Sequence, residues 1–202
     1  MFQPYYNLVK LLRKDAVVSE TSSWIFRATP YITFISVLII SLLVPVLSSQ
    51  VPLNFTGDII LIIYLFALAR FFLVLTSLDT GSAFGGMGGS REMMVSSMAE
   101  PAMILSFFTV ALTVNSTNLS NITSTLLNNS ILLLNPSLIL AFAALTIVLI
   151  AETGRIPVDN PFTHLELTMI HEGMMLEFSG RYLALVEWAS SMKLLLLLTI
   201  LV

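Results

Sequence analysis

A series of five apolar stretches is the feature that most constrains the fold of this sequence. A helix needs about 20 mostly apolar residues to cross the hydrocarbon core of a bilayer. Backbone groups in lipid must find their hydrogen bonds inside the protein, so a crossing stretch has to be a helix. The sequence therefore predicts an all-α polytopic transmembrane helix bundle. It forms a single membrane domain over residues 1–202, with spans near 31–49, 58–78, 93–114, 132–151 and 182–202.

The composition agrees with a chain whose solvent is lipid. Of the 202 residues, 56% are hydrophobic and 10% are charged, and the mean hydropathy is +0.93. Soluble domains carry about 25% charged residues. The formal charge of −3 gives no indication of a nucleic-acid partner. Because the chain has no cysteine, thiolate-bound iron–sulfur clusters are expected only on other subunits.

Basic residues alternate between the connections and predict the orientation of the spans. The 1–29 segment and the connections 79–92 and 152–181 contain Lys or Arg, whereas 50–57 and 115–131 contain neither. We therefore expect a multi-pass protein of the plasma membrane, with its N-terminus and these two loops in the cytoplasm. The 115–131 connection contains N-glycosylation sequons, which fit an external loop, although a polar loop alone also explains them.

The N-terminal segment has no apolar run of the kind found in signal peptides. Residues 4–14 place apolar and basic side chains on opposite stripes of a helix, a pattern typical of a helix that lies in the membrane surface. The apolar stripe consists of Tyr5, Leu8, Val9 and Leu12. The alternative is a basic tail without order.

Charged side chains inside the predicted spans are candidates for function, because each costs roughly 2.5–3.5 kcal/mol to insert. Glu100 lies about a third of the way into the third span, Glu187 lies in the fifth, and Glu152 ends the fourth. A carboxyl group at such depth must be neutral, paired or hydrated. For Arg70 and Lys193 a simpler interpretation exists, namely that both side chains snorkel to the headgroups.

The 79–92 connection is rich in glycine, with five glycines between positions 81 and 89. Glycine permits backbone conformations that other residues avoid. We therefore expect either a flexible hinge or a rigid loop packed closely against a neighbour, with Asp79 and Arg91 holding its ends. The segment is not a P-loop, because no Gly-Lys-Ser/Thr follows.

The 152–181 connection is the segment whose sequence is most informative about function. Its prolines keep the first half extended, and Thr163 with Glu166 forms a capping box that predicts the start of a helix. Glu166 and Glu177 are eleven residues apart and would share one face of that helix. The two histidines lack a third ligand at a plausible spacing, so no zinc site is expected. The connection either only docks a partner, or docks one and also lines a cavity or an ion path.

Several motifs in these connections resemble one family. The 151–181 segment is similar to the signature loop of the quinone-cavity membrane subunit of NADH–quinone oxidoreductase (complex I), on AETGRIPVDNP at 151–161, Glu166, and EFSG at 177–180. A larger set of stretches resembles more closely the membrane subunit of energy-converting (group 4) NiFe hydrogenases, of the formate hydrogenlyase subunit 4 type. The residues that carry this resemblance are DTGSAFGGMG at 79–88, SREMM at 90–94, AEPA at 99–102 and RIPVDNPFTHLELTMIHE at 155–172.

The resemblance implies a role in coupling electron transfer to proton or sodium translocation and in holding a hydrophilic redox arm on the membrane. It implies an ion path through Glu100, Glu152 and Glu187, and it implies cavity and coupling-loop roles for Asp79, Arg91, Arg155, Asp159, Glu166 and Glu177. No catalytic or metal-binding residue is expected on this chain. The NiFe centre and iron–sulfur clusters would lie on partners, which include the large and small hydrogenase subunits, iron–sulfur subunits and antiporter-like membrane subunits.

Three alternatives remain beside this interpretation. The chain is a quinone-cavity subunit of the complex I branch, an independent secondary transporter, or a structural anchor; the sequence has no visible internal repeat to support a transporter. The family also has a helix before the amphipathic segment and further helices after the fifth span. We therefore expect a split gene, a fragment, or a partner that supplies those helices.

Overall fold

The structure, a computed structural model, describes residues 3–19, 22–45, 59–129, 132, 134–156, 158–159 and 170–201. Within these residues the secondary structure consists of α-helices, with short turns between them and no extended strand. The helices are α1 (Gln3–Leu12), α2 (Trp24–Leu43), α3 (Ile59–Asp79), α4 (Ala83–Val114), α5 (Leu119–Asn128), α6 (Pro136–Glu152), α7 (His171–Met175) and α8 (Gly180–Leu201).

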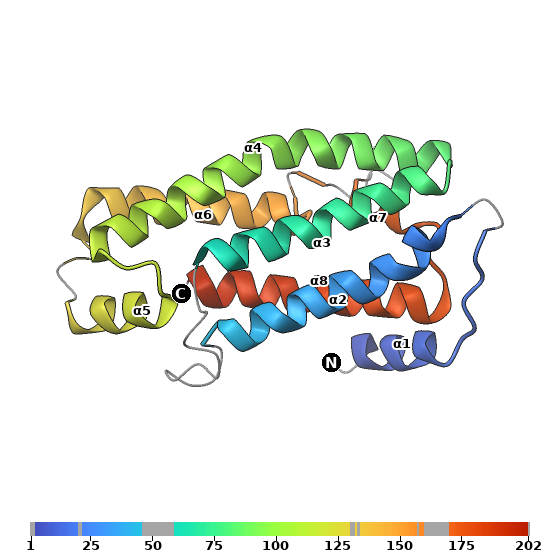
Figure 1. The fold of residues 1–202 in the computed structure, drawn as a ribbon, viewed down its shortest axis with the longest axis horizontal. Helices are drawn as coiled ribbons and strands as arrows, with labels where there is room; N and C mark the ends of the chain where they lie inside the picture. The colour runs from blue at the N-terminus through green and yellow to red at the C-terminus, as the bar shows by residue number, and fades with distance from the viewer. Residues whose placement is uncertain are drawn as a thin grey trace.

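The helices confirm a polytopic membrane bundle. Among the described residues, α2, α3, α4 and α8 are long and apolar enough to cross a bilayer, and α6 is a shorter apolar helix of 17 residues. Figure 1 shows these five helices running along the longest axis of the molecule. Neighbouring helices pack along their lengths, with α3 against α2 and α4, α6 against α4, and α8 against α2 and α6.

Apolar side chains fill the centre of the bundle and also cover its outside. Ile40, Phe66, Met103 and Leu196 are at most 1% exposed and belong to one continuous core. Leu112 on α4 is 72% exposed, as expected for a side chain that faces lipid. Because lipid tails are as apolar as the core, close packing and interhelical hydrogen bonds have to hold the helices together.

One such hydrogen bond joins α2 to α3 inside the bundle. The hydroxyl of Thr76 donates to Thr29 Oγ1 at 2.6 Å, and both residues are buried. At the end of the same helix pair, Asp79 Oδ2 accepts the backbone N–H of Ser23 at 2.8 Å, and Ser23 is the N-cap of α2. Asp79 therefore satisfies a backbone donor that precedes the first turn of a membrane helix.

Helix α1 confirms that the N-terminal segment is helical, and the alternative of an unordered tail is wrong. None of its residues is buried. The 15–18 segment that follows crosses the beginning of α8, where the N–H of Val17 donates to Ser179 Oγ and that hydroxyl donates to the carbonyl of Val17, both at 2.8 Å. Gly180 has φ +53°, and a Cβ there would overlap the carbonyl of Asp15. The close crossing therefore requires glycine.

The glycine-rich segment is not a loop, and this prediction from the sequence is wrong. Only residues 80–82 form the turn after α3, and α4 begins at Ala83, with Ser82 Oγ accepting the N–H of Gly85 at 3.1 Å. The other expectation for this segment, close packing on a neighbour, is correct. A Cβ on Gly88 would lie 3.0 Å from the carbonyl oxygen of Ile170, so the backbones of α4 and α7 meet without side chains between them.

The 152–181 connection is only partly described. Thr163 and Glu166, with the predicted capping box, lie outside the described residues. Helix α7 ends at Met175, so Glu177 follows the helix and the expectation of one continuous helix carrying it is wrong. Figure 1 shows α7 in the same half of the bundle as the 80–82 turn, whereas α5 lies at the opposite end.

Candidate functional site

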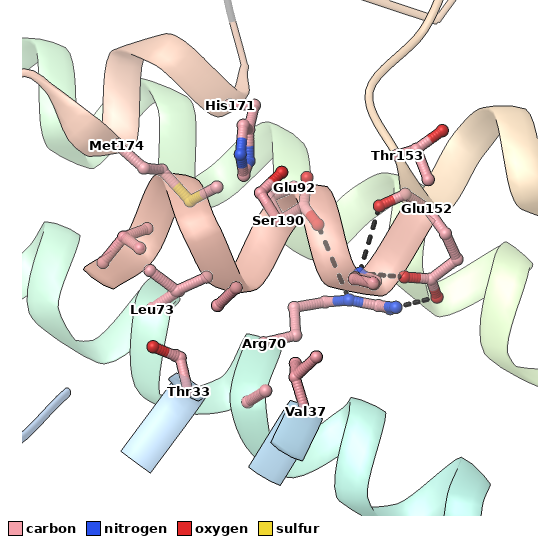
Figure 2. A pocket seen from close by; sticks show the side chains of 14 residues that line it. Thr33, Val37, Arg70, Leu73, Glu92, Glu152, Thr153, His171, Met174 and Ser190 are labelled. Atoms are coloured by element: carbon pink, nitrogen blue, oxygen red, sulfur yellow. Dashed lines mark hydrogen bonds and ion pairs between the residues drawn. The ribbon is translucent and has the colours of Figure 1, made fainter. Parts of the chain in front are cut away.

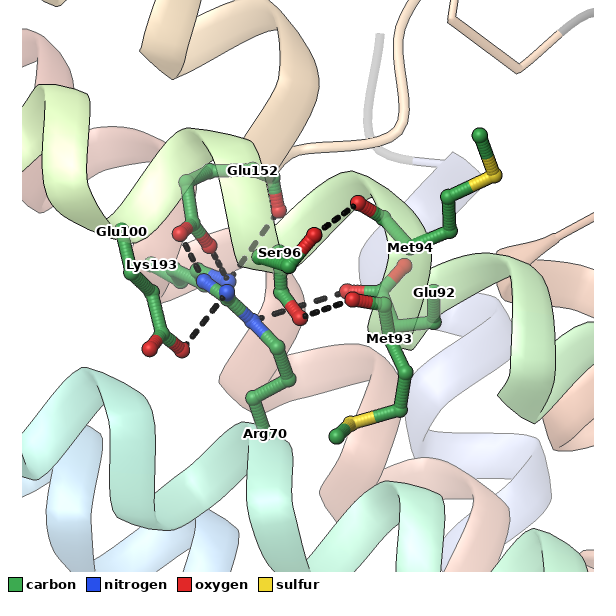
Figure 3. A network of polar contacts seen from close by, with 9 residues as sticks. Arg70, Glu92, Met93, Met94, Ser96, Glu100, Glu152 and Lys193 are labelled. Carbon is green, nitrogen blue, oxygen red and sulfur yellow. Dashed lines mark hydrogen bonds and ion pairs between the residues drawn. The ribbon is translucent and has the colours of Figure 1, made fainter.

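Arg70 of α3 is the centre of a buried charge cluster that joins four helices. Its Nη1 lies 3.0 Å from Glu100 Oε1, and its Nε lies 3.6 Å from Glu92 Oε1, both on α4. Its Nη2 pairs with Glu152 Oε1 at the end of α6. Figure 3 shows the three carboxylates converging on the guanidinium from two helices. A planar guanidinium has five N–H donors, so it can pair with several carboxylates at once.

Lys193 of α8 completes the charge cluster from the opposite side of Glu152. Its ammonium donates to Glu152 Oε2 at 2.7 Å and to the backbone carbonyl of the same residue at 3.1 Å. The ammonium also lies 5.9 Å from the centre of the Phe66 ring, within range of a cation–π interaction. Glu152 therefore shares its two carboxylate oxygens between two cations from different helices.

The cluster is enclosed by the bundle. The side chain of Glu152 is 1% exposed and that of Arg70 is 5% exposed, whereas Glu100 keeps 37% of its side-chain surface. The interpretation that Arg70 and Lys193 snorkel to the headgroups is wrong, because both are paired inside the protein. Glu152 also lies in the interior rather than among headgroups. An unpaired charge at such a place is very costly, so the five side chains depend on one another.

A small cavity of about 40 Å³ adjoins the cluster (Figure 2). At 10–15 Å³ for each water, it has room for about three water molecules. The cavity is lined by cluster members and by polar groups from the loop side, namely Thr33, Arg70, Glu92, Glu152, Thr153, His171, Ser190 and Lys193, together with six apolar residues. The site can therefore hold hydrated charge inside an otherwise apolar bundle.

Asp159 connects the 152–181 connection to this cavity. It is 5% exposed, and its Oδ2 accepts the backbone N–H groups of Ile170 (3.2 Å) and His171 (3.0 Å). These bonds satisfy donors at the beginning of α7, and the carboxylate places a negative charge at the N-terminus of this helix. The pKa of His171 is lowered from its usual 6.5 to about 4, mainly by burial and further by the positive charge of Lys193. The imidazole is therefore neutral at neutral pH.

The structure brings together only some of the residues predicted from the sequence. Glu100 and Glu152 lie in the cluster, and Asp159 lies beside it, whereas Glu187 is half-buried on α8 and takes no part in the cluster's ion pairs. The remaining predicted residues lie apart from the cluster. Asp79 caps α2, Arg155 is exposed, Arg91 and Glu177 are half-buried, and Glu166 is outside the described residues.

Three members of the cluster were not predicted as site residues. Arg70 and Lys193 carry a visible signal, since each is a basic residue within an apolar stretch. Glu92 was assigned to a loop, although it is eight residues before Glu100 and a helix places both on nearly the same face. Among the described residues, no group of three or more His, Asp or Glu side chains is arranged to hold a metal ion.

The fold and the site define a membrane-embedded helical protein with a charged interior. The family model described as NADH dehydrogenase matches residues 1–202. The chain belongs to this family.

Curated relatives include two bacterial hydrogenase subunits. Formate hydrogenlyase subunit 4 of Escherichia coli (strain K12) is 38% identical, over 98% of this chain and 63% of that protein. Hydrogenase-4 component C of the same organism is 36% identical, over 96% and 60%. An NADH-quinone oxidoreductase subunit of Syntrophotalea carbinolica is 28% identical, over 98% and 64%. The chain thus spans less than two thirds of the length of these relatives.

A solved structure shares the fold. In the membrane-bound sulfane sulfur reductase, an archaeal respiratory membrane complex, one chain superposes with a TM-score of 0.81 at 20% sequence identity. The superposition covers 98% of this chain and 64% of that one. At this identity the similarity concerns the fold alone.

Proposed function

We propose that this chain is the ion-translocating membrane subunit of a multisubunit energy-converting NiFe hydrogenase. The observation that carries the proposal is the buried charge cluster, in which three carboxylates meet two cations. With all five groups ionised the cluster has a net charge of −1. One proton or one monovalent cation would neutralise it, and a group that binds and releases one positive charge inside a membrane is what translocation requires.

Glu152 is shared between Arg70 and Lys193, and this sharing supports the movement of a proton through the cluster. If Glu152 binds a proton, both cations lose part of their attraction, and Glu100 becomes the carboxylate that Arg70 holds most closely. The charge distribution then has two arrangements separated by one proton. Such a pair of states is the element that a redox event has to bias.

The 152–181 connection supplies the path by which that bias reaches the cluster. Glu152 is the last residue of α6, Asp159 follows it in the chain and is hydrogen-bonded to the beginning of α7, and α7 lies against the cavity. A change of charge on a docked redox partner would displace this connection electrostatically, and the displacement would alter the pairing of Glu152. Glu187, which lies apart from the cluster, would serve as a later step of the ion path.

The arrangement of the helices agrees with a cytoplasmic location for this connection. Figure 1 shows the 13–19 segment, the 80–82 turn and the beginning of α8 at one end of the bundle, and α7 in the same half of it. Apart from Arg70 and Lys193 of the charge cluster, the basic residues lie before or near the beginning of α2, in the first part of α4, at the beginning of α8, or in the connection after α6, and they are Lys10, Arg13, Lys14, Arg27, Arg91, Arg155 and Arg181. Positive residues gather on the cytoplasmic side of membrane proteins, so a redox arm would dock at this end.

The comparisons favour the hydrogenase branch over the quinone branch. The two hydrogenase relatives are 38% and 36% identical to this chain, whereas the NADH-quinone oxidoreductase relative is 28% identical. The alternative function is the quinone-cavity subunit of a complex I type enzyme. A quinone that protects the 152–181 connection against a photolabel would favour that alternative.

Purification of the native complex in mild detergent tests the proposal. We expect nickel, iron–sulfur proteins and hydrogen evolution in the recovered complex. A complex without nickel that reduces quinone would move the chain to the alternative function. Recovery of the chain without any redox partner would contradict both functions.

A further inference from the structure

His171 places an unsatisfied nitrogen against the cavity of the charge cluster. Its Nε2 is buried and has no hydrogen-bond partner among the described residues. Arg70 Nε is likewise buried without a hydrogen-bond partner there. Figure 2 shows the imidazole on one side of the cavity and the guanidinium on the other. Buried polar groups without protein partners are commonly satisfied by internal water, and this cavity has room for about three molecules.

Of the two carboxylates that line the cavity, Glu92 is the one that cations hold less closely. It meets Arg70 Nε at 3.6 Å, which is too long for a hydrogen bond. Both oxygens of Glu152, in contrast, are engaged by cations, and Glu100 does not line the cavity. A water chain from the imidazole would therefore end on Glu92 before it reached the more tightly paired carboxylates.

We propose that His171 is a proton relay into the charge cluster. The imidazole takes up a proton at one ring nitrogen from water on the side of the 152–181 connection. It then releases the proton from its other nitrogen through cavity water to the carboxylate of Glu92. The half-buried residue, with Nε2 turned into the cavity, joins the two sides. The inference rests on the proposed function, because it names the residue through which protons reach the cluster.

The surroundings of His171 favour passing a proton on rather than keeping it. Lys193 from α8 and Arg70 from α3 line the same cavity; the charge of Lys193 disfavours the imidazolium, whereas that of Asp159 from the connection favours it. The carboxylates facing the cavity are Glu92 from α4 and Glu152 from α6. Burial has the largest effect and lowers the pKa of His171 to about 4. The neutral form of the ring is therefore strongly favoured at neutral pH, and a proton on the ring is readily given up.

The test uses the complete complex in proteoliposomes with a pH indicator in the lumen. We expect His171→Gln to lower proton uptake for each electron pair by about a hundredfold, the lower end of general acid–base effects. Glu172→Gln is the matched control, because Glu172 is the next residue of α7 and is exposed. Its proton uptake should stay within twofold of the wild type, on the order of experimental variation for a surface substitution.

Chemical rescue separates a relay from a structural role. Added imidazole should restore proton uptake in His171→Ala, and methylated imidazoles should restore it according to their basicity. A residue that only packs α7 would not respond to a soluble base. Wild-type proton uptake in His171→Gln, or a His171→Ala complex that imidazole does not restore, would overturn the relay. A wild-type complex that transfers electrons but moves no proton would contradict the proposed function itself, and with it the relay.

Discussion

The ammonium of Lys193 holds Glu152 at two places, its carboxylate at 2.7 Å and its backbone carbonyl at 3.1 Å. The second contact satisfies a carbonyl at the C-terminal end of α6, where the helix has no backbone donors left to offer. A cation at this end of a helix is also favoured by the helix dipole. Lys193 therefore stabilises both the charge cluster and the end of a helix inside the membrane domain.

Lys193→Met should destabilise the protein by about 3 kcal/mol, because it leaves a buried carboxylate oxygen without its partner. Thermal unfolding in detergent, followed by tryptophan fluorescence, measures the effect. The control is Lys14→Met, which removes an exposed charge and should change stability by less than about 0.5 kcal/mol. The double variant Lys193→Met/Glu152→Gln should recover part of the loss. Equal stability of the two single variants would contradict the interdependence of the buried charges.

Glu100→Gln should preserve assembly and electron transfer but abolish ion translocation. Glu100 keeps 37% of its side-chain surface, so an amide of the same shape fits without a large cost to folding. The amide, however, cannot hold a proton or attract Arg70 as a charge. The measurement is ion uptake for each electron pair in proteoliposomes, with Glu172→Gln as a control in which the same change is made on an exposed residue. Unchanged uptake would remove Glu100 from the ion path.

Two glycines of α4 should respond in opposite ways to alanine. At Gly88 a Cβ would lie 3.0–3.3 Å from backbone atoms of Ile170, Gly173 and Met174, so Gly88→Ala should separate α7 from α4 and cost about 1–3 kcal/mol. At Gly86 no atom lies within 4 Å of the added Cβ, so Gly86→Ala should gain up to about 1 kcal/mol from helix propensity. Hydrogen exchange of the 170–175 amides would localise the effect. Equal unfolding temperatures would contradict the direct backbone contact.

The stability of the protein should fall on acidification in a window set by His171. The unfolded chain binds a proton at this residue below about pH 6.5, whereas the folded chain binds it only below about pH 4. The unfolded state therefore takes up more protons between these values, and the linkage relation makes folding less favourable as the pH falls. The loss at pH 5 should be about 1–2 kcal/mol. It should be absent from His171→Gln, so parallel pH profiles of the two proteins would contradict this assignment.

The spans were predictable because their signal is local. Helix α3 is a mostly apolar stretch at 59–78 with Arg70 as its one charge, and a stretch of this kind has to form a helix in lipid. The beginning of α4 was not predictable in this way. Glycine is a poor helix former, so the 81–89 sequence indicates a loop. In the fold, Gly88 lets the backbone of α7 approach α4, and α7 is distant in the sequence.

The sequence marks some residues of the charge cluster as unusual, but it does not show which of them pair with each other. The depth of Glu100 and Arg70 in apolar stretches marks both as unusual. Nothing in their spacing, however, indicates that they meet, because they lie on different helices. For the same reason the sequence does not reveal that Lys193 reaches Glu152 rather than the headgroups. Pairing depends on how the helices are rotated against each other, and packing decides that rotation.

The crossing of the 15–18 segment over Ser179 also has a consequence for how the protein sits in lipid. It joins two parts of the chain that are 162 residues apart. An amphipathic helix such as α1 keeps to the boundary between headgroups and acyl chains. Because the segment after α1 is hydrogen-bonded at the beginning of α8, α1 and α8 cannot change their depth in the membrane independently. A bilayer that becomes thinner or thicker would therefore move the first turn of α8 with it, and membrane thickness would act directly on the region next to α7.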